Sequence, residues 1–165
     1  MITSKYLPFG YDKDEGFKNF NLNSISFIKD GIYLRSIKYF DIEITKLISF
    51  LVRDKNWNNY SPSILNEDIT INKDSISFKF KLEYSDDVQK FLTTNTFLIN
   101  NNSIKILSKG KFLTNFETNR IGYNVLLPLK KVVSQKLIIT NDKSKKIKSN
   151  FPEIITPDQP FINIS

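Results

Sequence analysis

The 165-residue sequence contains no cysteine and no histidine. It therefore lacks a disulfide framework, a cysteine nucleophile and an imidazole base, together with the side chains that most often bind zinc and other transition metals. Hydrolysis by a serine–histidine–aspartate triad, a cysteine–histidine pair or a histidine-bound zinc ion is excluded within this chain. We accordingly expect neither a metal nor an organic cofactor.

Alanine is also absent, and there are only five glycines and six prolines. Because alanine is the strongest helix former, its absence lowers the expected helix content. The longest apolar runs, such as Val125–Leu127, are much shorter than the roughly 18 residues that a membrane-spanning helix needs. The amino terminus shows no apolar signal segment. We therefore expect a soluble, cytoplasmic protein with no membrane partner.

The net charge of +7 is concentrated in one segment, residues 129–148, which holds seven lysines and a single acid, Asp142. The rest of the chain is nearly neutral, and only three arginines occur in total. Since planar arginine groups usually read bases and phosphates, nucleic acid is not an expected partner. We interpret the lysine-rich segment as a solvated edge hairpin that discourages sheet aggregation. The alternative is a basic protein-interaction surface.

Period-two alternation of apolar and polar residues is the dominant local pattern. The segment Ser75–Tyr84 has its apolar side chains on one face and Ser, Lys and Glu on the other, which predicts a half-buried antiparallel strand. Asp30-Gly31 supplies the residue type that a tight hairpin turn requires. Only Asp86–Leu92 fits a short helical turn. The other predicted strands are 24–28, 31–38, 42–52, 68–72, 103–107, 111–116, 121–127 and 136–140.

Many short strands separated by Asn- and Asp-rich turns predict an all-β fold, an antiparallel β-sandwich of about nine or ten strands. We assign residues 1–150 to this sandwich. Residues 151–165 differ, because three of the six prolines lie between Pro152 and Pro160 and proline is excluded from central strands. We expect this proline-rich segment to be extended and irregular, either as a tail over the sandwich or as the connection to a following domain.

Three motifs stand out from this background, and they occur in a fixed order along the chain. The first surrounds the only tryptophan, Trp57, the second surrounds Arg120, and the third is the proline-rich end. Together they resemble the N-terminal region of the D-apionate lactonase family, bacterial hydrolases of sugar-acid lactones. The matching residues are Arg53, Asp54, Asn56, Trp57 and Tyr60, then Asn119, Arg120, Gly122, Val125, Leu126 and Pro128, then Phe151, Pro152, Ile155, Pro157, Gln159, Pro160 and Phe161.

The departures from the family pattern lie at Leu127 and Asp158, where histidines are expected, and at Asn58, where glycine is usual. Family members are several times longer than this chain. The resemblance therefore implies an N-terminal β-sandwich followed by a barrel-type domain that carries the hydrolytic carboxylates. On this basis we expect a non-catalytic domain, with that barrel domain as its partner and a sugar acid as a possible ligand.

Five residues are candidates for ligand or interdomain contacts: Arg53, Asp54, Trp57, Asn119 and Arg120. The two arginines are suited to holding a carboxylate in a bidentate manner. The simpler interpretation is that each pairs with a neighbouring acid such as Asp54, Glu117 or Glu67. Trp57 is expected to anchor a core or an interface.

No catalytic residue is predicted. The adjacent acids Asp86-Asp87 and Glu67-Asp68 face opposite ways on a strand, so neither pair converges on one substrate atom. A stand-alone carbohydrate-binding module is a further hypothesis, which requires Trp57, Tyr60 and Tyr123 to form an exposed stacking surface.

Overall fold

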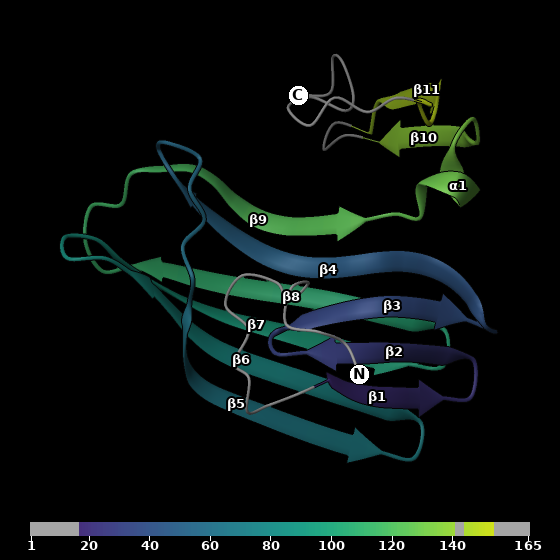
Figure 1. Ribbon diagram of the computed structural model, residues 1–165, viewed down its shortest axis with the longest axis horizontal. Coiled ribbons are helices and arrows are strands. Elements are labelled where there is room, and N and C mark those ends of the chain that lie inside the picture. The colour runs from purple at the N-terminus through teal and green to yellow at the C-terminus, as the bar shows by residue number, and fades with distance from the viewer. Residues whose placement is uncertain (1–16, 141–143, 154–165) are drawn as a thin grey trace. The chain divides into compact units, whose positions relative to one another are not determined.

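The computed structural model describes residues 17–140 and 144–153 of the chain. The chain forms two compact units, Met1–Leu126 and Leu127–Ser165, each of which is described by itself. The first unit contains two antiparallel sheets, which Figure 1 shows as stacked layers. The predicted all-β sandwich is thus confirmed.

One layer is a five-stranded sheet with the order β1-β2-β3-β4-β9. Its strands are β1 (Phe17–Leu22), β2 (Ile25–Asp30), β3 (Tyr33–Tyr39), β4 (Ile42–Asp54) and β9 (Thr118–Leu126). The other layer is a four-stranded sheet with the order β5-β6-β7-β8. Its strands are β5 (Ser63–Asn72), β6 (Ser75–Ser85), β7 (Lys90–Asn100) and β8 (Ser103–Phe112). The chain leaves the first sheet after β4, builds the second sheet, and returns through β9.

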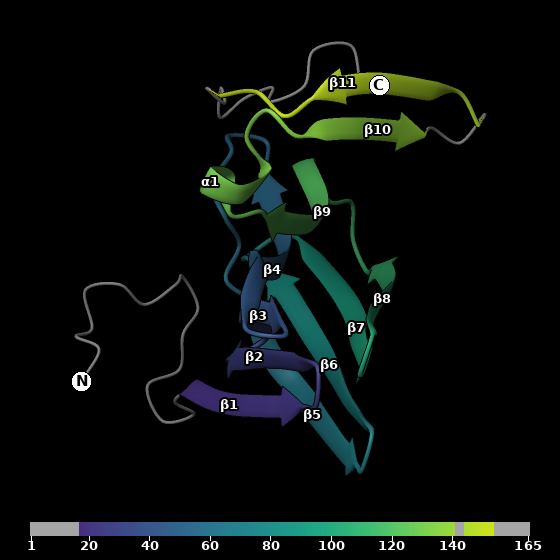
Figure 2. The same ribbon diagram turned by 90° about the vertical axis from the view of Figure 1, so that its right-hand side faces the viewer.

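The core lies between the two layers, which are also visible in Figure 2. The alternation read from the sequence of β6 is confirmed, because all five of its apolar side chains are at most 3% exposed: Ile76, Phe78, Phe80, Leu82 and Tyr84. Phe78 contacts the opposite sheet, with ring-centroid distances of 5.2 Å to Phe20 and 5.9 Å to Phe27. Aromatic rings therefore join the two sheets.

Polar groups interrupt the core-facing side of β7. Thr93 and Asn95 are each 2% exposed, between the buried Phe91 and Phe97. The Ser108 hydroxyl on β8 donates a hydrogen bond of 2.6 Å to the Asn95 side-chain oxygen, and it lies 2.8 Å from the Tyr123 hydroxyl on β9. Asn95 is therefore satisfied through a small polar network that joins the two sheets.

The hydroxyl of Tyr84 is buried without a hydrogen-bond partner among the residues that the structure describes. Burial also raises the pKa of this group above its ordinary value. An unpaired buried hydroxyl is unfavourable, so Tyr84→Phe is expected to leave the stability unchanged or to raise it by up to about 1 kcal/mol. Urea denaturation of the two proteins measures the difference. A clear loss of stability would show that the hydroxyl has a partner.

The turns account for several differences from the predicted strands. Gly31 has φ +54 between β2 and β3, which confirms the predicted hairpin turn. The expected break in β8 is wrong: β8 continues to Phe112, and the Phe91 ring covers the Gly110 position, 2.6 Å from where a Cβ would lie. The expected helical turn at Asp86–Leu92 is also wrong, because Asp86 accepts backbone hydrogen bonds from Val88 and Gln89 in a turn that leads into β7.

The second unit contains the helical turn α1 (Leu129–Val132) and a hairpin of β10 (Lys136–Thr140) and β11 (Lys146–Asn150). The lysine-rich segment therefore does form a hairpin, but the hairpin is a separate two-stranded sheet and not an edge of the sandwich sheets. Of the proline-rich segment, only Phe151–Glu153 belongs to the described residues, and these three are outside any strand. The boundary after Asn150 stays a prediction.

Candidate functional site

The first two sequence motifs meet at one end of the sandwich. The end of β4 pairs with the start of β9, and Arg53 lies directly opposite Arg120 in this antiparallel ladder. The register then shifts, because Asp54 pairs with Thr118 and leaves Asn119 as an extra residue in β9. A glycine inside a strand commonly marks a bulge or a close backbone approach. In β9 the irregularity lies at Asn119 instead, and Gly122, with φ +155, has open space where a Cβ would lie.

Asp54 organises the loop that carries Trp57. One of its carboxylate oxygens accepts hydrogen bonds from the backbone N–H groups of Asn56 and Asn58, both at 2.8 Å, and the other accepts one from the Asn58 side chain. These hydrogen bonds, with the Asn58 side chain as the largest cause, hold the pKa of Asp54 below its usual value. Asp54 is therefore a loop cap, of the kind that short acidic side chains form in turns.

The side chain of Trp57 extends from this loop and remains 45% exposed. Its backbone has φ +70, which is the left-handed region that large side chains rarely adopt. The guanidinium groups of Arg53 and Arg120 lie over the indole, 5.6 Å and 5.1 Å from the ring centroid. Each contact contributes about 0.5–1 kcal/mol at an exposed site. The result is a cluster of two arginines and one tryptophan, called the Arg–Trp–Arg cluster below.

The acids that were expected to neutralise these arginines have other partners. Asp54 caps the loop, Glu117 pairs with Lys55 at 2.7 Å, and Glu67 pairs with Lys29 at 2.7 Å. Among the described residues, no carboxylate forms an ion pair with Arg53 or Arg120. The expectation of local charge pairing is therefore wrong, and the cluster brings together two guanidinium groups that have no ion-pair partner in the described part of the chain. Asn119 lies beside them as an exposed residue of β9.

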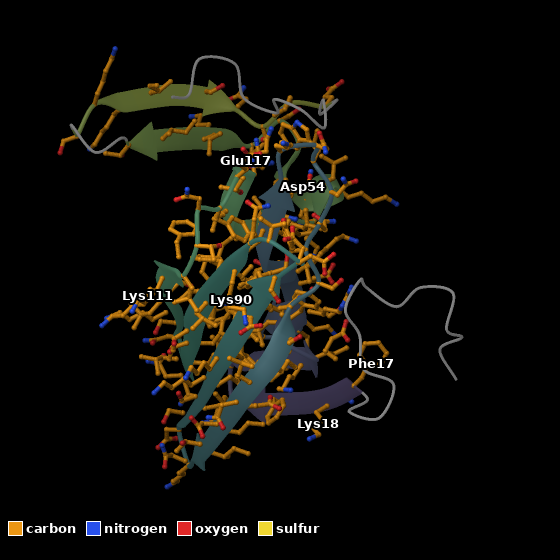
Figure 3. All side chains as sticks on the ribbon, turned by 90° about the vertical axis from the view of Figure 1, so that its left-hand side faces the viewer. Phe17, Lys18, Asp54, Lys90, Lys111 and Glu117 are labelled. Atoms are coloured by element: carbon orange, nitrogen blue, oxygen red, sulfur yellow. The ribbon has the colours of Figure 1, made fainter. Side chains whose placement is uncertain are left out.

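Glu117, just before β9, and Thr118, its first residue, hold the Trp57 loop in place. The Thr118 hydroxyl donates a hydrogen bond of 2.7 Å to the backbone carbonyl of Arg53, next to the Lys55–Glu117 ion pair. Figure 3 shows Asp54 and Glu117 at the same end of the sandwich. Neither contact was predicted, because the partners are 62 and 65 residues apart and no local pattern links them.

A second polar network supports the same end of the sandwich. The Tyr60 hydroxyl donates a hydrogen bond of 2.6 Å to Asp86, and the Gln89 side chain donates one of 3.1 Å to the same hydroxyl. Burial and the neighbouring Asp86 carboxylate raise the pKa of Tyr60 to about 12. The Tyr60 hydrogen bond, followed by those from Val88 and Gln89, lowers the pKa of Asp86 to about 2.

The depressed pKa of Asp86 predicts an acid-dependent loss of stability. Because an unfolded aspartate titrates near pH 4, the unfolded chain binds more protons than the folded chain between about pH 4 and pH 2. The contribution of Asp86 is therefore present above about pH 4 and is lost as the pH falls towards 2. Asp86→Asn is expected to flatten the dependence of unfolding free energy on pH in this interval. The matched control is Asp87→Asn, since Asp87 makes no hydrogen bond to the described residues. An equal slope in wild type and Asp86→Asn would contradict the assignment.

The aromatic residues near the cluster do not form one exposed surface. Tyr60 packs on Phe116 with a ring-centroid distance of 5.2 Å, and Tyr123 contacts Phe50 and Phe97 in the core. Only Trp57 of the three is largely exposed. The stacking surface required by the hypothesis of a carbohydrate-binding module is therefore absent from the described part of the chain.

The acids considered for acid–base chemistry have structural roles. Asp86 caps a turn, Glu67 pairs with Lys29, and Asp68 accepts a hydrogen bond from Asn66. Within residues 17–140 and 144–153, no group of three or more acidic side chains is placed to hold a metal ion. In the same residues, no helix has the length and apolar character needed to cross a membrane.

The sequence from residue 12 to residue 165 matches the family model of the D-apionate lactonase N-terminal domain. The chain belongs to this family. The D-apionate lactonase of Brucella anthropi is 26% identical to it over 136 residues, which cover 81% of this chain. No solved structure matches the chain.

The chain spans only 22% of the length of the Brucella anthropi D-apionate lactonase. It therefore corresponds to an N-terminal domain of D-apionate lactonase, with most of that relative's length outside the matched region. The family assignment confirms the resemblance read from the three motifs. The structure adds that Arg53 and Trp57 of the first motif lie beside Arg120 of the second, although the two motifs are far apart in the sequence. Their role as ligand or interdomain contacts stays a prediction.

Proposed function

We propose that this chain is a non-catalytic N-terminal domain that packs against a following domain, and that the following domain hydrolyses a sugar-acid lactone. The observation that carries this proposal is its family membership combined with its coverage of only 22% of the D-apionate lactonase from Brucella anthropi. In that relative the matched region is accompanied by a much longer remainder, which has room for a barrel-type catalytic domain.

The structural roles of the acids support a non-catalytic domain. Lactone hydrolysis needs a group that activates water, placed within hydrogen-bond reach of the reacting atoms. Asp54 and Asp86, the two acids with depressed pKa values, are held by loop hydrogen bonds. A carboxylate with a depressed pKa is a weak base, so neither is suited to that step.

Exposed apolar side chains support a role in packing against another domain. The turn between β3 and β4 presents four of them, each at least 39% exposed: Tyr39, Phe40, Ile42 and Ile44. Phe40 and Asp41 both have positive φ in this turn, and the Phe40 side chain is 67% exposed. Exposed apolar groups of this kind commonly mark an interaction surface.

Two tests address the proposal. The isolated chain is incubated with aldonolactones, and turnover no faster than in buffer is expected. Clear turnover by the purified chain would show that it is itself a catalyst. The coding sequence downstream of Ser165 is also read, and an in-frame or adjacent barrel-type domain is expected there. If the downstream sequence encodes neither an in-frame nor an adjacent barrel-type domain, the proposed partnership is wrong.

A further inference from the structure

We propose that the Arg–Trp–Arg cluster binds a side-chain carboxylate of the following domain, so that Arg53, Trp57 and Arg120 form a charged contact of the interdomain interface, at the other end of β4 from the exposed apolar turn. This inference rests on the proposed function and identifies the surface and the chemistry of the contact.

The first argument is the position of the two arginines in the sheet. Arg53 and Arg120 are directly opposite each other on β4 and β9. Like charges in this arrangement repel each other and destabilise a sheet. The indole of Trp57 offsets part of this repulsion, because both guanidinium groups lie over its electron-rich ring. An anion bound by both arginines would remove the rest of the repulsion between the two guanidinium groups.

The second argument is that the cluster has unused hydrogen-bond donors. The Nε–H group of Arg53 is buried and has no hydrogen-bond partner among the described residues. Buried donors of this kind are normally paired. The nearby acids do not supply an acceptor, since Asp54 caps the loop and Glu117 pairs with Lys55. A carboxylate is the acceptor that matches a guanidinium fork best.

The third argument is that the cluster is preorganised. Trp57 is held at φ +70 by a loop that Asp54 closes, and its backbone N–H donates to the Asp54 carbonyl at 3.1 Å. A left-handed backbone at a large residue is unfavourable and persists only where the surrounding structure fixes it. Here the strained conformation keeps an aromatic ring 45% exposed. Tryptophan and arginine are the residues most often found at the energetic centre of protein interfaces.

A side-chain carboxylate fits these observations better than a small ligand does. Small-molecule sites are usually concave and bury most of the ligand, whereas Trp57 and Arg120 are exposed at the end of the sandwich. The chain also accounts for only 22% of the length of its relative, so a large protein surface is available as the occupant. When another domain docks on Arg53 and Arg120, their charges become buried. The docked domain therefore needs an acidic side chain opposite them.

The experiment uses the single tryptophan of the chain as the reporter. The 165-residue chain is produced with 5-fluorotryptophan, which places one fluorine at Trp57, and its ¹⁹F NMR signal is recorded. The following domain is produced from the coding sequence downstream of Ser165 and added unlabelled. Variants Arg53→Gln, Arg120→Gln and the double variant are compared with wild type. The matched control is Lys105→Gln/Lys111→Gln, which removes the same charge from two exposed positions of β8.

We expect the following domain to shift or broaden the Trp57 signal in the wild type and in the lysine control. Each arginine variant is expected to bind the following domain at least about tenfold more weakly than the wild type. This is the loss of affinity that is typical when a residue carrying much of an interface's binding energy is replaced. Arg53→Lys/Arg120→Lys keeps the charge but loses the planar fork, and we expect it to be intermediate. Circular dichroism verifies that each variant is folded. Binding that survives in the folded double Gln variant overturns the inference but leaves the proposed function standing.

Two further outcomes separate the remaining possibilities. If the wild-type chain does not bind the following domain at all, the proposed function fails and this inference fails with it. Sodium gluconate and sodium acetate are titrated in parallel as free carboxylates. Saturable, arginine-dependent binding of either at submillimolar concentration, with no competition from the following domain, would identify a small-ligand site and overturn the interdomain assignment.

Discussion

Phe78→Ala is expected to destabilise the sandwich by about 3–5 kcal/mol, the range for truncating a fully buried phenylalanine. Phe78 is 0% exposed and contacts rings from both sheets: Phe20, Phe27 and Phe80. Its removal leaves a cavity where the two sheets are joined, and neighbouring aromatic rings can fill such a cavity only in part. The expected loss is a large fraction of the stability of an ordinary domain.

Urea denaturation followed by Trp57 fluorescence and circular dichroism measures this effect. For a domain of this size the midpoint is expected to fall by about 2 M urea. Lys79→Ala is the control, because it truncates the neighbouring exposed residue of the same strand and is expected to change stability by less than about 0.5 kcal/mol. Equal midpoints for Phe78→Ala and Lys79→Ala would contradict the assignment of Phe78 to the core.

Lys29→Met is expected to cost about 3 kcal/mol, since it leaves the carboxylate of Glu67 without its cation. Lys29 is 3% exposed, and its ammonium group is 2.7 Å from Glu67 on the other sheet and 5.5 Å from the centre of the Phe80 ring. Breaking a buried ion pair costs about 3–5 kcal/mol. The lower end applies because Glu67 is 19% exposed and remains partly hydrated.

The exposed pair Lys55–Glu117 provides the comparison for this prediction. It has the same nitrogen–oxygen distance of 2.7 Å, but its side chains are 67% and 66% exposed. Exposed pairs contribute little, so Lys55→Met is expected to leave the urea midpoint nearly unchanged. The double variant Lys29→Met/Glu67→Met is expected to recover most of the lost stability, because it removes both charges from the interior. A double variant as unstable as Lys29→Met would show that the lysine acts through other contacts.

Sequence patterns predicted the sandwich wherever apolar and polar residues alternate without interruption, as in β6. They failed to predict β7, because Thr93 and Asn95 occupy core-facing positions and hide the alternation. Asn95 is tolerated there only because Ser108, on the neighbouring strand, donates to it. They also divided β8 at Gly110, where the Phe91 ring supplies the packing that glycine lacks. In both strands a cross-strand partner decides the outcome, and a single strand's sequence does not contain that partner.

The sequence identified the residues of the candidate site but not the partners of these residues and of the acids near them. Arg53, Trp57 and Arg120 were identified from the motifs, and the structure brings them together. Their expected acid partners were wrong for a local reason. The carboxylate of Asp54 is closer to the backbone N–H groups of its own loop than to any arginine fork, and it is satisfied there first. Glu117 likewise has a partner other than the arginines, because it forms an ion pair with Lys55.

The left-handed backbone of Trp57 also has a consequence for the evolution of this loop. Glycine adopts φ +70 without steric strain, and asparagine tolerates it, so either residue would let the loop close more easily than tryptophan does. Selection for folding alone therefore disfavours tryptophan at this position. The proposed interdomain contact would favour it, since neither replacement offers a ring to the two arginines. Under that proposal, stability and recognition would select different amino acids at residue 57.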